Sequence, residues 1–131
     1  MMVGMGVSIY YTATRANGLT EAEAIAVNSA VERYPIEELL KLCQISDEQY
    51  DGEDFCVYPA DEPYEPDVIF EGATKLPFYS QYVMGRSIQY WCQLLSQVRR
   101  ILPDAEWSVH VDDIHIPWNN ESFEFEPSKA K

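Results

Sequence analysis

Both histidines of the chain lie in one short segment, WSVHVDDIHIPW, at residues 107–118. If Asp112 and Asp113 are the central residues of a two-residue hairpin loop, His110 faces His115 across the strand pair. Their Cβ atoms would then lie about 5 Å apart, which allows two imidazoles to share one metal ion. A third ligand would have to come from Asp112 or Asp113, so the segment predicts a candidate metal site made of His110, His115, Asp112 and Asp113.

The same segment also has a purely structural interpretation. Asp-Asp suits a tight hairpin loop less well than Asn-Gly, so Asp112 and Asp113 equally fit a β-bulge or a longer bend. Histidines on a solvated sheet face need a further constellation of groups before they act in catalysis or metal binding. In the hairpin, the apolar residues would pair on the other face: Val111 with Ile114, Val109 with Ile116 and Trp107 with Trp118.

No catalytic residue and no cofactor is predicted elsewhere in the chain. The three cysteines, Cys43, Cys56 and Cys92, form neither a C-x-x-C pair nor a zinc-like cluster, and no G-x-S-x-G motif is present. The stretch at 47–52 resembles the opening of an EF-hand loop. However, Gln49 at position three and Tyr58 at position twelve replace the required acids, so we interpret it as an exposed acidic loop.

The net charge of −13 is concentrated in one part of the chain. Residues 37–71 hold twelve acidic side chains and Lys41 as the single basic one. This excess argues against nucleic acid and anionic membranes as ligands, since both need a cationic face. It favours a surface that recognises a basic protein, although acidic charge that serves solubility alone would look the same. The residues predicted to contact such a partner are Asp47, Asp51, Glu53, Asp54, Asp61, Glu62 and Tyr64.

Tyrosines accompany the acidic segment. Tyrosine supplies a large contact area with little loss of rotamer freedom, so these rings can anchor a partner, or else they belong to the core and cover the sheet edge. The tyrosines in or near the segment are Tyr50, Tyr58, Tyr64, Tyr79, Tyr82 and Tyr90.

Periodicity predicts an α+β domain over residues 1–131. Val7, Ile9 and Tyr11 alternate as in a strand, and Thr20 with Glu23 has the form of a capping box that starts a helix. Pro35 should kink this helix or divide it in two. The other expected elements are strands at 55–58 and 68–70, a long helix from about 80 to 102, the hairpin at 107–118 and an extra C-terminal strand around 123–125.

This order of elements matches the ferredoxin-like βαββαβ arrangement, an antiparallel sheet with two main helices on one face. The odd cysteine count and the lack of a basic leader before the first strand predict a cytoplasmic location. We therefore expect a non-catalytic acidic cytoplasmic binding protein, inhibitor- or immunity-like, that recognises a basic protein surface. The alternatives are a small metal-dependent enzyme or ligand-binding domain that uses the His/Asp cluster, and a homodimer formed through an exposed sheet face or edge.

Overall fold

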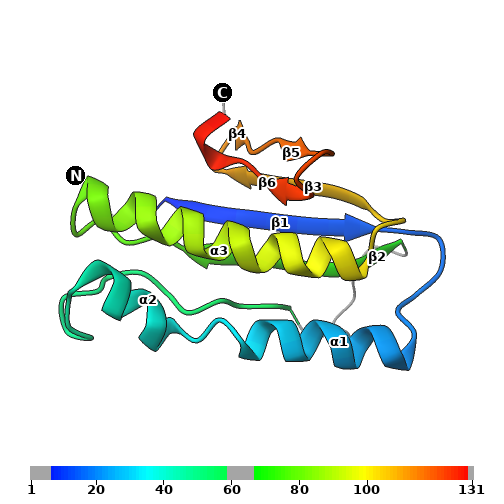
Figure 1. Ribbon diagram of the computed structural model, residues 1–131, viewed down its shortest axis with the longest axis horizontal. Coiled ribbons are helices and arrows are strands. Elements are labelled where there is room, and N and C mark those ends of the chain that lie inside the picture. The colour runs from blue at the N-terminus through cyan, green and yellow to red at the C-terminus, as the bar shows by residue number, and fades with distance from the viewer. Residues whose placement is uncertain (1–6, 59–66, 130–131) are drawn as a thin grey trace.

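The computed structural model describes residues 7–58 and 67–129. Over these ranges the elements follow one another along the chain as Figure 1 labels them. They are β1 (Ser8–Thr14), α1 (Glu21–Glu32), α2 (Ile36–Cys43), β2 (Val68–Lys75), α3 (Gln81–Ile101), β3 (Glu106–Val111), β4 (Ile114–His115), β5 (Trp118–Asn119), β6 (Glu124–Phe125) and the short 3₁₀ helix η1 (Pro127–Lys129).

The main sheet has four antiparallel strands in the order β2-β1-β3-β4, so the α+β class is confirmed. Its central strand β1 turns Ile9, Tyr11 and Ala13 toward the core, where each is fully buried. Tyr10, on the opposite face, is exposed. The helices lie on the Tyr11 side: α3 runs alongside β1, and α1 and α2 follow each other below it (Figure 1).

The helices begin and end where local sequence signals predict. At the start of α1 the Thr20 side chain accepts the Glu23 N–H at 3.1 Å, and the Glu23 carboxylate accepts the Thr20 N–H at 2.9 Å, which is the complete capping box. Pro35 lies between α1 and α2, so the divided helix is confirmed. Ser80 caps α3 through the Val83 N–H, and the fully buried Trp91, one of the large side chains of this helix, lies in the core.

The expected strand at 55–58 is wrong. In this segment only Val57 makes a bridge, to Gly72 of β2. A Cβ on Gly72 would lie 2.1 Å from the Cys56 carbonyl oxygen, so glycine is what lets this backbone pass so close to β2. Phe55 turns inward instead, with its ring centroid 4.7 Å from Tyr11 and 5.5 Å from Trp91. Tertiary packing of Phe55 therefore overrides the strand propensity of the segment.

Two expectations for the C-terminal part are also corrected. Trp107 does not face Trp118: Trp107 pairs with Ala13 of β1, and Trp118 pairs with Phe125 in a separate two-stranded sheet, β5-β6. The C-terminal strand is thus present but does not extend the main sheet. Pro117, which lacks an amide proton, separates the hairpin from Trp118. The Arg99 guanidinium lies 4.3 Å from the Trp118 ring centroid and holds this small sheet against α3.

Candidate functional site

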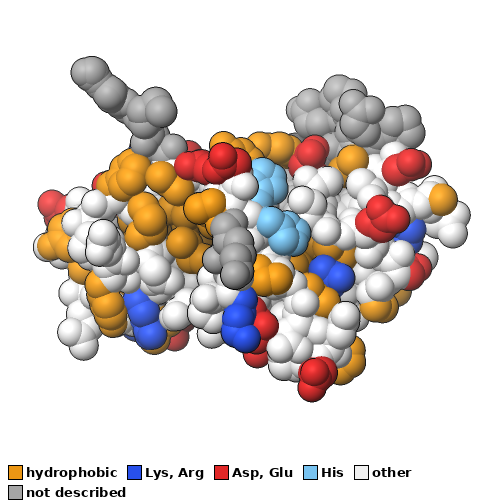
Figure 2. All heavy atoms as spheres, turned by 90° about the horizontal axis from the view of Figure 1, so that it is seen from above, with side chains coloured by type: hydrophobic (Ala, Val, Ile, Leu, Met, Phe, Trp, Pro, Cys, Tyr) orange, Lys and Arg blue, Asp and Glu red, His pale blue; other side chains and the backbone are white. Residues whose placement is uncertain are grey.

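The histidine hairpin forms with the predicted register. His110 pairs with His115, and Val111 pairs with Ile114, while Asp112 adopts a positive φ of 49° in the loop. The paired histidines lie on the sheet face opposite the helices, where Figure 2 shows the two imidazoles next to each other. The sequence therefore predicted correctly which two side chains meet.

The surroundings of the histidines do not complete a metal site. The His110 ring stacks on Tyr10, with a centroid separation of 5.1 Å, and its Nδ1 is in hydrogen-bonding contact with the Asp112 backbone carbonyl. Asp112 also accepts the Ser8 N–H at 3.4 Å. Within residues 7–58 and 67–129, no three His, Cys, Asp or Glu side chains gather closely enough to hold a metal ion. The pair is brought together, but Asp112 and Asp113 do not provide a third ligand.

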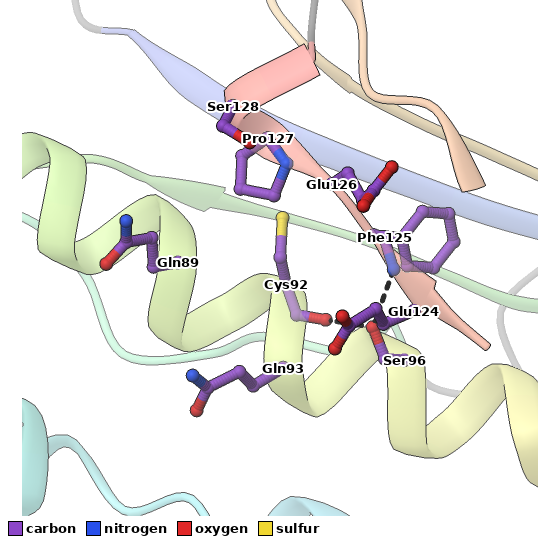
Figure 3. A pocket seen from close by; sticks show the side chains of 9 residues that line it. All are labelled: Gln89, Cys92, Gln93, Ser96, Glu124, Phe125, Glu126, Pro127 and Ser128. Carbon is purple, nitrogen blue, oxygen red and sulfur yellow. Dashed lines mark hydrogen bonds between the residues drawn. The ribbon is translucent and has the colours of Figure 1, made fainter. Parts of the chain in front are cut away.

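The two buried cysteines, Cys92 and Cys43, are not suited to act as nucleophiles. Cys92 lines a polar cavity of about 220 Å³ beside α3, and Figure 3 shows its sulfur pointing toward Pro127 and Ser128. Burial raises the pKa of the Cys92 thiol to about 12 and also raises the pKa of Cys43. Because the thiolate is the nucleophilic form, both groups are protonated and unreactive at neutral pH.

Three of the four described acidic residues that were predicted to bind a partner accept hydrogen bonds from backbone amides of the chain itself. One Asp51 oxygen accepts the backbone N–H groups of Phe78 and Tyr79, at 2.9 and 3.1 Å. The Glu53 carboxylate accepts the Lys75 N–H at 3.1 Å, and Asp54 accepts the N–H of the next residue, Phe55. Asp47 is exposed in the turn after α2. The remaining three predicted contacts, Asp61, Glu62 and Tyr64, lie outside the described residues.

The hydrogen bonds of Asp51 place two exposed aromatic residues, Phe78 and Tyr79, beside a carboxylate, and a third, Tyr82, follows at the start of α3. Phe78, Tyr79 and Tyr82 are 52%, 50% and 61% exposed, and the Gln49 side-chain amide donates to the Tyr79 hydroxyl at 3.1 Å. We call this region the acidic–aromatic surface. It comprises Asp47, Glu48, Asp51, Glu53, Asp54, Phe78, Tyr79 and Tyr82.

The other tyrosines divide between surface and core. Tyr90 is buried and donates its hydroxyl proton to the Pro35 carbonyl at 2.7 Å. Tyr50 is half-buried near Ser87, and Tyr58 is exposed. Phe78 was not among the predicted contacts. The signal that could have identified it is its position after Pro77 in the connection before the Ser80 cap, because connecting loops run over the protein surface.

Arg15, which follows the end of β1, lines a further cavity of about 300 Å³. The five N–H donors of Arg15 are shared among the Glu23 and Asp104 carboxylates and the carbonyls of Asn17 and Gly18. The guanidinium is thus saturated within its own chain. It fixes the turn from β1 into α1, which is a structural role.

We expect acid to weaken the contact between Arg15 and Glu23 at the turn from β1 into α1. Hydrogen bonding by Arg15 lowers the pKa of Glu23 from 4.5 to about 2. Since folding favours ionised Glu23, its stabilisation is complete above about pH 4.5 and is lost as the pH falls toward 2. In urea unfolding across this pH range, Glu23→Gln should lose stability less steeply than the unaltered chain, and Glu32→Gln on the same helix should keep the original slope. Identical slopes for all three proteins would contradict this prediction.

The chain matches no family model, no curated protein and no solved structure. Within the described ranges, no helix combines the length and the apolar character that crossing a membrane requires. We therefore infer function from the geometry of the molecule.

Proposed function

We propose that the protein is a non-catalytic binding protein that recognises a basic protein through its acidic–aromatic surface, in the manner of an inhibitor or immunity protein. The observation that supports this most directly is that Asp51 holds the backbone of the half-exposed Phe78 and Tyr79, with the exposed Tyr82 close by in sequence at the start of α3. Aromatic residues are typical binding hot spots, and complementary charge speeds encounter with a partner.

The rigidity of the loop at 76–80 strengthens this proposal. Asp51 holds two consecutive backbone amides of the loop, and Gln49 holds the Tyr79 hydroxyl. Leu76 at the start of the loop is fully buried, and Ser80 at its end caps α3. Rings fixed before binding lose less conformational entropy when a partner docks, so more of their contact energy remains as affinity.

The proposal extends to topology and compartment. We infer that the fold derives from the ferredoxin-like arrangement, with the segment at 55–58 as a second strand reduced to the Val57–Gly72 bridge. That bridge is antiparallel and lies on the β2 side of the sheet, as the arrangement requires. A cytoplasmic location is supported by three free thiols, Cys43, Cys56 and Cys92.

The test is to map binding of a synthetic oligolysine peptide by NMR chemical shifts on the ¹⁵N-labelled protein. We expect shifts at 47–54 and 78–82, an association constant that falls with salt, and no shifts with an oligoglutamate peptide of the same length. Replacing Asp47, Glu48 and Asp54 with lysine should weaken this binding severalfold, because attractive contacts become repulsive.

The matched control reverses three exposed carboxylates elsewhere, Glu21, Glu32 and Glu121, to lysine. Both triple variants have the same net charge, so only the position of the charge differs. The control should retain the shifts at 47–54 and 78–82. Equal weakening in the two variants would show that net charge governs binding, and the proposed surface would be wrong.

A further inference from the structure

An apolar groove opens between the N-terminal half of α3, the β3–β4 hairpin and η1. It has a volume of about 300 Å³ and is lined mainly by Gly85, Ile88, Val111, Ile114, Ile116 and Pro127. Figure 2 shows hydrophobic side chains gathered on this side of the molecule, next to the two histidines. None of the residues that line the groove belongs to the acidic–aromatic surface.

One stripe of α3 is covered along only half of its length. Toward the C-terminal end, Cys92 and Ser96 are buried beneath β6 and η1, and Ser96 accepts the Phe125 N–H at 2.9 Å. One turn toward the N-terminus, Ile88 is only partly buried. No described residue fills the groove beside it. The same helix face is therefore packed by β6 and η1 at one end, whereas at the other end no part of the chain that the structure describes covers it.

The N-terminal half of α3 carries a glycine, Gly85, that the fold itself does not require. A Cβ placed on Gly85 would meet no atom within 4 Å, and its φ is not positive, so neither space nor backbone conformation requires glycine. Glycine inside a helix costs about 1 kcal/mol relative to alanine. The missing side chain leaves the α3 backbone accessible from the groove.

We propose that this groove receives the apolar face of an amphipathic, basic helix from the partner protein. This inference rests on the proposed function, which supplies the basic character of the partner. Apolar helix faces typically dock in grooves of this kind. Asp112 and Asp113 are exposed on the hairpin loop between the groove residues Val111 and Ile114, where they can meet lysine or arginine. A second copy of the chain would instead bring together two molecules of net charge −13.

The groove also continues the acidic–aromatic surface. Tyr82, 61% exposed, lies one helical turn before Gly85 on α3. A single partner can therefore contact the carboxylates and aromatic rings at the start of α3 and extend a helix along it into the groove. The groove would add the apolar anchor that the acidic carboxylates do not offer.

The experiment compares two synthetic peptides with the same leucine and lysine composition. One is arranged as an amphipathic helix, and the other is scrambled so that its leucines no longer share a face. On the ¹⁵N-labelled full chain, the amphipathic peptide should shift the amides of Gly85, Ile88 and Ile114. It should bind about tenfold more tightly than the scrambled peptide, as expected for burial of part of a large apolar side chain.

Gly85→Leu fills the groove and should abolish this difference between the peptides while leaving the binding of the scrambled peptide unchanged. Urea unfolding checks that the variant is folded, and we expect no loss of stability, since leucine is a far better helix former than glycine. Asn28→Leu on α1 is the matched control: it adds the same side chain to an exposed helix position, and it should keep the tenfold preference.

The possible results separate this inference from the proposed function. If both peptides shift only residues 47–54 and 78–82, the groove is not a docking site, although the acidic–aromatic surface binds. If neither peptide shifts any amide, both proposals are wrong. If the groove amides shift with protein concentration in the absence of peptide, a second copy occupies the groove and the inference is overturned.

Discussion

Replacing Tyr11 with phenylalanine is expected to lower the free energy of unfolding by about 1–3 kcal/mol, the cost of leaving buried polar groups without partners. The fully buried Tyr11 ring carries a hydroxyl that donates to the Cys56 carbonyl and lies 2.8 Å from the Thr74 hydroxyl. The same hydroxyl accepts the Cys56 N–H at 3.3 Å. Because the segment at 55–58 makes only one bridge to the sheet, this hydroxyl substitutes for the missing strand pairing. Urea denaturation measures the loss.

Thr74→Val is the control for the same network, since it removes the second hydroxyl and keeps the shape of the side chain. The two substitutions should be non-additive, because each disrupts a hydrogen bond that the other also removes. The amides of Phe55 and Cys56 should exchange with solvent faster in Tyr11→Phe than in the unaltered chain. Unchanged stability together with unchanged exchange would show that Tyr11 does not anchor this segment.

The helices could be predicted because their signals are local. Thr20 and Glu23 are three residues apart, so the capping box is visible in the sequence. The apolar stripe of α3 and its Ser80 cap are also short-range patterns. The hairpin register followed from alternation around Asp112 and Asp113 in the same way.

The segment at 55–58 could not be predicted for the opposite reason. Its conformation depends on Tyr11, which is 45 residues away from Cys56, and on Gly72, which allows a close backbone approach. Neither contact leaves a pattern within the segment itself. The displacement of Trp118 onto Phe125 is similar, since it depends on packing against Arg99 of α3 as well as on Pro117.

In the candidate sites, too, local features could be predicted from the sequence and long-range contacts could not. The sequence indicated that His110 and His115 meet, because sheet register is a local property, but whether a third ligand comes within reach is a three-dimensional question. The position of acidic charge along the chain was evident, whereas the hydrogen bonds of Asp51 to Phe78 and Tyr79 span more than 25 residues. A carboxylate that holds backbone amides and one that awaits a basic partner look identical in the sequence.

Asp51 distinguishes these two roles experimentally. In Asp51→Ala, the Phe78 and Tyr79 amides lose their acceptor and should exchange about tenfold faster, which corresponds to about 1.4 kcal/mol. The loosened aromatic loop should also bind the oligolysine peptide more weakly. Asp51→Asn keeps an oxygen acceptor but removes the charge, so it should retain most of the protection while losing only the electrostatic part of the affinity. If both variants exchange as slowly as the unaltered chain, Asp51 does not hold the loop, and the rigidity attributed to the aromatic rings must come from Leu76 and Ser80 instead.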